Sequence, residues 1–174
     1  MSGNILVFIP TYNERENVEK ICADILRLGL GLDVLFLDDN SPDGTGVVLD
    51  RISENHSNVH VIHRTGKLGI GSAHTDGINW AYDQGYTNLI TMDCDFTHQP
   101  EALPEFISNA AVYDIVVGSR FMLRNSLYEW NLYRKVMTFI GHFLTKKCLK
   151  MTYDATGAFR LYRLDKIPRR VFHV

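Results

Sequence analysis

The chain has 174 residues, of which 45% are hydrophobic and 22% are charged, and its formal net charge is −2. A chain of this length buries roughly 70% of its unfolded surface, so we expect one domain over residues 1–174 with its own core. The small negative charge provides no basic field for nucleic acid, which we therefore exclude as a partner.

The cysteines and the N-terminal sequence indicate in which cellular compartment we expect the protein. Cys22, Cys94 and Cys148 are scattered and odd in number, which favours reduced thiols of a cytoplasmic protein over disulfides or a zinc site. The N-terminus lacks a signal-peptide pattern, and no apolar run reaches the roughly 18 residues that span a bilayer. Residues 168–174 resemble the middle of an element, so we expect a truncated or naturally short form.

Short apolar segments alternate with helical patterns along the chain. Helices are predicted over about 16–28 and 72–84, and strands over 4–9, 34–37, 59–62, 88–92 and 115–117. This alternation predicts an α/β protein with a mostly parallel sheet. Each strand is followed by polar, acidic or glycine-rich residues. Ligands bind at the carboxyl edge of such sheets, so these loops together indicate a site.

Asp93 and Asp95 follow the predicted strand 88–92 directly and are separated by one residue. Two carboxylates held this close repel each other, and a divalent cation removes that cost. Mg²⁺ or Mn²⁺ carrying phosphate oxygens suits the arrangement. An acidic turn that caps the next helix is the alternative. His98 is more typical of a surface or capping position, so we do not include it among the ligands.

A helix is predicted over about 129–150, with apolar residues on roughly half of its circumference. Arg134 and Thr138 lie one turn apart on the polar half, which suits the binding of a single anion. The aromatic, lysine-flanked composition also suits a membrane interface. An ordinary helix that packs on the sheet explains the periodicity equally well.

Six motifs occur in order along nearly the whole chain: PTYNE at 10–14, DDNSPDGT at 38–45, GKLGIGSA at 66–73, DCDFTHQPE at 93–101, GSRF at 118–121 and DATGAFRLYR at 154–163. Together they resemble the family 2 glycosyltransferases of the GT-A fold, a three-layer αβα sandwich. The branch most similar makes polyprenyl-phosphate sugars and is typified by dolichyl-phosphate mannose synthase.

The resemblance implies a nucleotide-sugar donor site. Asp39 is expected to contact the base or ribose directly, with Asp38 beside it, although the following Asn-Ser-Pro-Asp-Gly also predicts a turn and Asp43 is expected to be structural. Asp93 and Asp95 are expected to bind the metal, with Asp95 catalytic and Thr97 nearby. The remaining donor-binding residues that the resemblance implies are Pro10, Tyr12, Glu14, Lys67 and Arg160.

The glycine-rich loop at 66–71 matches neither a P-loop nor a dinucleotide fingerprint, so a flexible turn competes with a phosphate-binding role. The resemblance assigns Arg120, Arg134 and Thr138 to the acceptor phosphate, with both arginines catalytic. Arg160 and Arg163 would stabilise the departing diphosphate. The role of Asp154 stays open, and the family's serine and glycine are replaced at Gly157 and Ala158.

The implied activity is metal-dependent, inverting transfer of a hexose from GDP-mannose or a UDP-sugar to a polyprenyl or dolichyl monophosphate. A phosphate monoester with a second pKa near about 6 is largely dianionic at neutral pH, so no carboxylate base is needed. The expected location is the cytosolic membrane face, with a membrane subunit or a second copy as partner. A hydroxyl-directed family 2 enzyme and a non-catalytic nucleotide-sugar binding module stay open, whereas a nucleotidyltransferase is disfavoured.

Overall fold

The computed structural model describes residues 4–119, 147 and 157–172. The predicted helix over 129–150 therefore lies outside the described residues, apart from Lys147, and so do Arg120, Arg134, Thr138 and Asp154. No helix in the described ranges combines the length and apolarity needed to cross a bilayer.

The described strands form one sheet of six in the order β3-β2-β1-β4-β6-β5. Strand β1 pairs in parallel with β2 and β4, β2 pairs in parallel with β3, and β6 is antiparallel to both β4 and β5. The mostly parallel sheet predicted from sequence is confirmed. The strands are β1 (Ile5–Thr11), β2 (Asp33–Asp38), β3 (Val59–His63), β4 (Asn88–Thr91), β5 (Ile115–Val117) and β6 (Arg160–Arg163).

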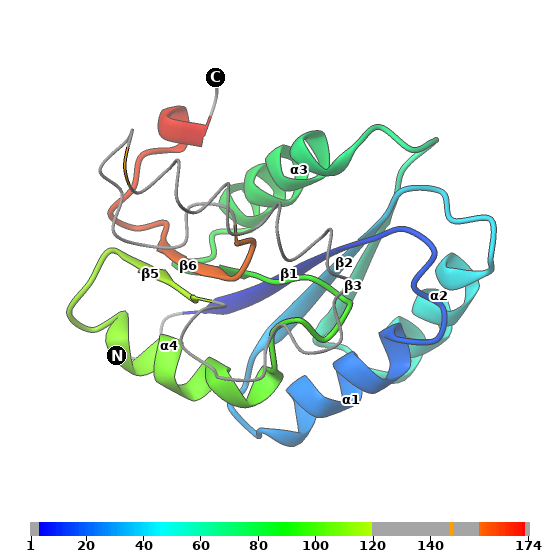
Figure 1. Cartoon of the computed structure of the whole chain (residues 1–174), viewed down its shortest axis with the longest axis horizontal. Helices are drawn as coiled ribbons and strands as arrows, with labels where there is room; N and C mark the ends of the chain where they lie inside the picture. The colour runs from blue at the N-terminus through cyan, green and yellow to red at the C-terminus, as the bar shows by residue number, and fades with distance from the viewer. Residues whose placement is uncertain (1–3, 120–146, 148–156, 173–174) are drawn as a thin grey trace.

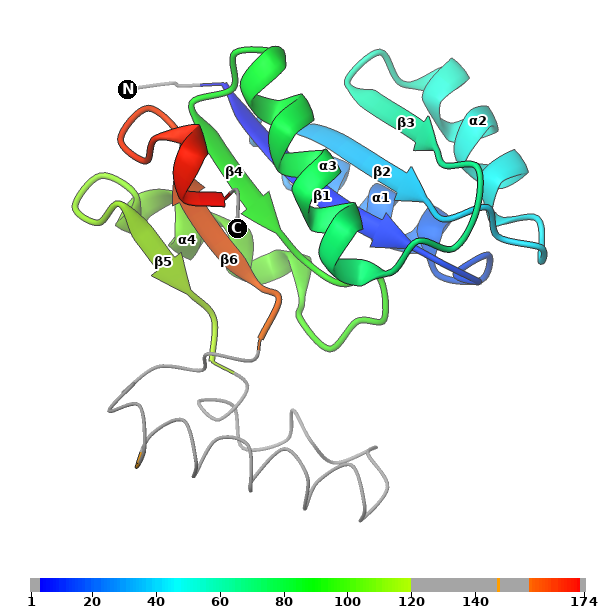
Figure 2. The same cartoon turned by 90° about the horizontal axis from the view of Figure 1, so that it is seen from above.

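Helices cover both faces of this sheet and complete three layers (Figure 1). Helices α1, α2 and α4 lie on one face, and α3 lies across the other, as the view from above also shows (Figure 2). Their bounds are α1 (Val18–Arg27), α2 (Thr45–Asn55), α3 (Ile70–Asp83) and α4 (Leu103–Asn109), with 3-10 turns η1 (Pro100–Ala102) and η2 (Arg169–Phe172).

The chain reverses its direction of travel across the sheet between β3 and β4. It first moves outward from β1 to β2 and β3, and α3 then carries it back over the sheet to β4 on the other side of β1. The loops that follow the adjacent strands β1 and β4 therefore run away from each other. A crevice forms outside such a switch point, and it is where ligands bind in this class of fold.

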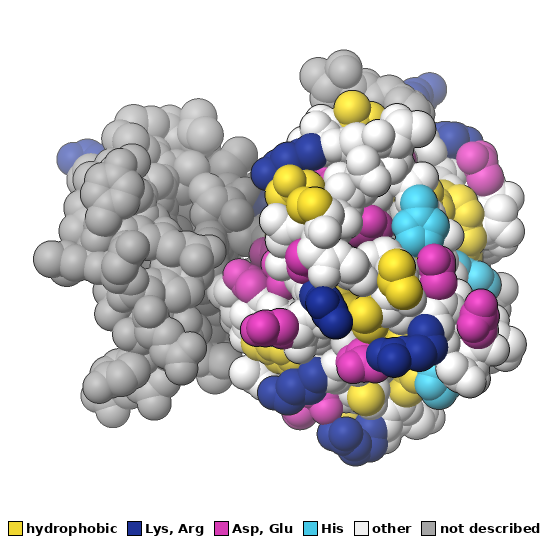
Figure 3. Space-filling model, turned by 90° about the vertical axis from the view of Figure 1, so that its right-hand side faces the viewer, with side chains coloured by type: hydrophobic (Ala, Val, Ile, Leu, Met, Phe, Trp, Pro, Cys, Tyr) yellow, Lys and Arg dark blue, Asp and Glu magenta, His cyan; other side chains and the backbone are white. Residues whose placement is uncertain are grey.

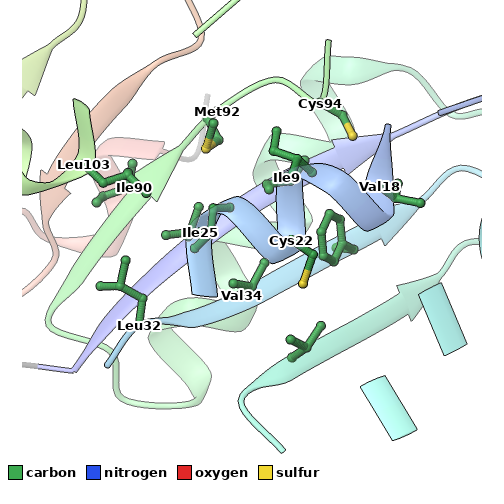
Figure 4. Close-up of a cluster of buried hydrophobic side chains, with 14 of the residues drawn as sticks. Ile9, Val18, Cys22, Ile25, Leu32, Val34, Ile90, Met92, Cys94 and Leu103 are labelled. Carbon is green, nitrogen blue, oxygen red and sulfur yellow. The ribbon is translucent and has the colours of Figure 1, made fainter. Parts of the chain in front are cut away.

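Hydrophobic burial on both faces explains why the strands are continuous apolar runs. On α1, Val18, Ile21, Cys22 and Ile25 recur at helical spacing and are at most 2% exposed. They pack over Ile9, Val34 and Ile90 of the sheet (Figure 4). Alternate residues of β1 pack beneath α3, because successive strand side chains point to opposite faces.

Strand β6 is the described element that the sequence did not predict as a strand. Its four residues, Arg160-Leu161-Tyr162-Arg163, begin and end with arginine and so lack the continuous apolar run that marks most of the other strands. Leu161 is fully buried between β4 and β5, so tertiary packing determines the conformation of this segment. Helix α3 also begins at Ile70, two residues earlier than the expected Ser72.

Gly77 of α3 lies directly on the ring of Phe8, and a Cβ atom there would stand 2.4 Å from the ring carbon Cε2. Phe8 is fully buried, so its ring cannot move aside freely. We expect Gly77→Ala to lower the free energy of unfolding by about 1–3 kcal/mol, measured by urea denaturation. Gly71→Ala, in the same helix with open space at its Cβ, is the matched control and should be neutral or slightly stabilising. Equal stability of both variants would contradict the packing analysis.

Candidate active site

A cleft of about 290 Å³ opens at the carboxyl edge of the sheet, outside the switch point between β1 and β4. Figure 3 views the molecule from the side toward which the parallel strands point, where acidic, basic and histidine side chains are interspersed. The cleft is lined from four loops by Pro10, Thr11, Tyr12, Glu14, Asp39, Lys67, Gly69, Ile70, Ala73, Asp93, Cys94 and Asp95. Most of the donor-site residues expected from the sequence therefore meet in one place.

The loop after β1 is fastened to the turn after β2. The backbone N–H of Asn13 donates to Ser41 Oγ at 2.9 Å, and that of Glu14 donates to Thr45 Oγ1 at 3.0 Å. Asn13 adopts a positive φ of 60°, which asparagine tolerates better than most residues. These bonds fix where Tyr12 and Glu14 enter the cleft.

Asp38 and Asp43 hold this turn. Both oxygens of Asp38 accept hydrogen bonds from Ser41, at 3.1 Å from its N–H and 2.5 Å from its hydroxyl, and Asp38 does not line the cleft. Asp43 accepts from the N–H and hydroxyl of Thr45 and from the N–H of Arg15. The structural role expected for Asp43 is therefore confirmed, whereas the carboxylate of Asp38, expected beside Asp39 in the donor site, is engaged by Ser41 outside the cleft lining.

Asp39 does reach the cleft, and its carboxylate is held from two sides. Oδ1 accepts a hydrogen bond from Arg64 Nη1 at 2.8 Å, and Oδ2 accepts one from the backbone N–H of Gly69 at 3.3 Å. Asp39 and Arg64 are nearly buried, with side chains 8% and 6% exposed. The turn chemistry and the placement of Asp39 in the cleft are thus compatible.

The loop after β4 presents Asp93 and Asp95 to the same cleft. Asp95 Oδ1 accepts a hydrogen bond from the N–H of Thr97 at 3.0 Å, across Phe96, which has a positive φ of 57°. A bulky residue in this conformation is rare and is typical of functional loops. His98 is buried, packs against Phe159 with 5.0 Å between ring centroids, and lies neither on the surface nor at a helix cap.

Negative potential is concentrated beside this loop. Burial, and to a smaller degree the charges of Asp95 and Asp43, raise the pKa of the Glu14 carboxyl above its ordinary value, although a hydrogen bond from Asn17 opposes the shift. Burial and the neighbouring carboxylates of Glu14 and Asp95 likewise raise the pKa of the Cys94 thiol.

Within the described residues, no three acidic, histidine or cysteine side chains are grouped closely enough to hold a metal ion by themselves. Two aspartates in a negative cleft instead fit a hard divalent cation that takes its other ligands from phosphate and water.

The glycine loop contributes a cation. Lys67 Nζ lies 3.9 Å from the centroid of the Tyr12 ring, and Lys67 lines the cleft together with the carboxylates. Gly69 has a φ of 93°, a conformation that favours glycine, and precedes the first residue of α3. The loop is thus a wall of the cleft.

The two arginines of β6 lie at opposite edges of the sheet. Arg160 pairs in register with Thr91 at the carboxyl end of β4, and its Nε donates to the Gly157 carbonyl at 3.0 Å. Arg163 is in register with Asn88 at the amino end and pairs with Asp165 at 2.8 Å. The structure therefore does not bring Arg163 to the cleft, because a strand of four residues separates the two ends.

Sequence reasoning did not single out Arg64, Ser41 or Thr45 as parts of this site. The partner of Arg64, Asp39, is 25 residues away in the chain, so no local pattern connects them. Ser41 and Thr45 were included in a turn motif, but their bonds to the β1 loop are long-range contacts.

Comparison with solved structures places the fold among the GT-A glycosyltransferases. Glucosyl-3-phosphoglycerate synthase from Mycobacterium tuberculosis, in complex with Mn²⁺, UDP and phosphoglyceric acid, superposes with a TM-score of 0.60 at 18% identity. The match covers 93% of this chain and 56% of that one. The family model for glycosyl transferase family 2 matches residues 6–169, and the chain belongs to that family.

Within this family, the chain is similar to two curated proteins whose names refer to undecaprenyl phosphate and to polyprenol monophosphomannose. Undecaprenyl-phosphate mannosyltransferase of Micrococcus luteus is 37% identical over 164 residues, covering 94% of this chain and 68% of that protein. Polyprenol monophosphomannose synthase of Mycolicibacterium smegmatis is 35% identical over 167 residues, covering 94% and 63%. The chain thus spans about two thirds of the length of these relatives.

The raised pKa of Glu14 has a consequence for stability. The folded state binds the Glu14 proton more tightly than the unfolded state, so the ionised carboxylate destabilises the fold at neutral pH. We expect Glu14→Gln to increase the free energy of unfolding at pH 7, with the gain vanishing below the ordinary carboxyl pKa of about 4.3.

Urea denaturation across this pH range measures the effect, with Glu54→Gln on the exposed face of α2 as the control. A Glu14→Gln variant that is less stable than the wild type at pH 7 would contradict the electrostatic account.

Proposed function

We propose that this chain transfers a mannosyl group from a nucleoside diphosphate sugar, GDP-mannose in the first instance, to a polyprenyl monophosphate. The observation that carries the proposal is the cleft at the switch point, where Asp39 stands on one side and Asp93 and Asp95 on the other. The names of the two curated relatives, both polyprenyl-phosphate mannose enzymes, support the choice of sugar and acceptor.

The cleft can accommodate the parts of such a donor in a fixed order. Asp39 offers carboxylate oxygens to the N–H groups of a base or to ribose hydroxyls, and the Tyr12 ring lines the same cleft. Lys67 supplies a positive charge for the diphosphate, because its ammonium group lines the same cleft. Base and diphosphate would thus lie along the line from β2 to β4.

The negative charge around Asp93 and Asp95 suits a bound Mg²⁺ or Mn²⁺, which those two residues would hold. When bound, the ion would neutralise the diphosphate and stabilise it as a leaving group. Thr97 orients Asp95 for this role through the hydrogen bond from its N–H. Arg160, at the same edge of the sheet, adds positive charge on the β6 side.

The acceptor chemistry explains why no general base is needed. A phosphate monoester has a second pKa of about 6, so at neutral pH the acceptor phosphate oxygen already carries the negative charge needed to attack the anomeric carbon. The bond to the anomeric carbon forms as the bond to the nucleoside diphosphate breaks, and the configuration inverts. Arg120, Arg134 and Thr138 remain our proposal for holding the acceptor phosphate, and the segment 129–150 for contact with the membrane that contains the lipid.

Transfer itself is the first measurement. Purified protein, radiolabelled GDP-mannose and a short polyprenyl phosphate in detergent with Mn²⁺ should give a lipid-extractable glycosyl phosphate. UDP-glucose and a polyprenol without phosphate are run in parallel as competing donor and acceptor. Donor binding in calorimetry without product or donor hydrolysis would instead favour a non-catalytic binding module, and transfer to the free hydroxyl would overturn the choice of acceptor.

The metal requirement gives a second prediction. Asp95→Ala should lower the transfer rate by at least about a hundredfold while the circular dichroism spectrum and melting temperature stay close to wild type. Asp165→Ala, which removes an aspartate paired with Arg163 at the opposite sheet edge, should retain transfer. Chelation should abolish wild-type turnover, and added Mn²⁺ should restore it; full turnover in excess chelator would refute the metal role.

A further inference from the structure

Arg64 follows β3 directly and is tied into the sheet and the cleft wall at once. Its backbone N–H donates to the Asp38 carbonyl at 2.9 Å, which extends the pairing of β2 and β3 by one residue. Its side chain then turns inward and is 6% exposed. An arginine is rarely buried this deeply unless its guanidinium group is paired.

The guanidinium group contacts three separate segments. Nη1 donates to Asp39 Oδ1 at 2.8 Å, and Nη2 donates to Ser72 Oγ at 2.7 Å in the first turn of α3. Nη1 also lies 3.5 Å from the Gly69 carbonyl, and Nε lies 3.4 Å from Asp76 Oδ2, within ion-pair distance. One planar group therefore joins the end of β2, the glycine loop and the start of α3.

This arrangement determines what Asp39 can offer a ligand. Each carboxylate oxygen has about two acceptor sites, and the protein uses one on each oxygen, through Arg64 and the Gly69 N–H. The remaining acceptor sites of Asp39 are available to a ligand, because Asp39 lines the cleft. Because Arg64 compensates its charge, Asp39 is suited to accept hydrogen bonds from a base or ribose rather than to bind the cation.

We propose that Arg64 is a positioning residue for nucleobase recognition: it orients Asp39 by holding its carboxylate against the start of α3. The proposal rests on the proposed function, because it assigns the base end of the same donor site. Arg64 does not line the cleft, so it acts through Asp39 rather than by touching the donor.

The test compares a nucleotide with a probe that has no base. Isothermal titration calorimetry with Mn²⁺ measures binding of GDP and of inorganic pyrophosphate to the wild type and to Arg64→Met. We expect GDP to bind about 10- to 100-fold more weakly to the variant, because a charge-assisted contact that orients Asp39 is lost. Pyrophosphate affinity should change by less than about threefold, since the Mn²⁺ that binds it would be held by Asp93 and Asp95, which lie outside the contacts of Arg64.

Three further variants make the outcome decisive. Arg64→Lys keeps the charge but loses the planar fork that reaches Asp39 and Ser72 together, so an intermediate loss is expected, and it replaces Arg64→Met should that variant not fold. In an Asp39→Asn background, the Arg64 substitution should cost little further GDP affinity. Arg169→Met, which removes an arginine paired with Asp83 at the far end of α3, should bind GDP as the wild type does.

Several outcomes would overturn the positioning role. They are wild-type GDP affinity in the Arg64 variant, an equal loss of GDP and pyrophosphate binding, or a full loss that persists in the Asp39→Asn background. Failure of the proposed function looks different, because the wild-type protein itself would then bind neither GDP nor UDP.

Discussion

The cleft depends on how this fold places negative charge at one sheet edge. Strands β1, β2 and β4 end side by side, and the loops that follow them bring Glu14, Asp39 and Asp95 to a common cleft. Partly buried like charges repel one another, and the structure compensates them unequally. Asp39 receives a buried guanidinium group, whereas the pKa values of Glu14 and Cys94 are raised first by burial and further by the neighbouring carboxylates beside β4. This asymmetry gives the cleft two chemically different ends.

The topology explains why the two ends are adjacent. Because α3 carries the chain back over the sheet, the loops after β1 and β4 diverge and leave room between them. The same crossover brings the glycine loop to the β2 side, where Gly69 contacts Asp39, while Lys67 reaches over the Tyr12 ring of the central β1 loop. In the function we propose, the base binds at the Asp39 end, where Arg64 compensates the negative charge. The cation and diphosphate bind at the end that carries Asp93 and Asp95. The chain belongs to glycosyl transferase family 2 and spans about two thirds of the length of its curated relatives.

Local patterns were sufficient to predict the parallel strands and the acidic loop that follows β4. The strand over 115–117 has the predicted bounds, and Asp93 and Asp95 meet the β1 loop because parallel strand ends share an edge. Local patterns alone do not distinguish the neighbours Asp38 and Asp39, and it was the family resemblance that favoured Asp39; which carboxylate faces the cleft depends on a turn closed by Ser41. They also missed β6, whose antiparallel position is determined by packing, and Arg64, whose partner is distant in sequence.

The central claim is that one cleft binds a nucleoside diphosphate with its base toward β2 and its phosphates toward β4. The most direct measurement is the position of the ligand in crystals grown with GDP and Mn²⁺, using the anomalous signal of manganese to locate the ion. The account predicts the base against Asp39 and Tyr12 and the manganese peak beside Asp93 and Asp95. A nucleotide bound outside this cleft, or a manganese peak away from both aspartates, would contradict it.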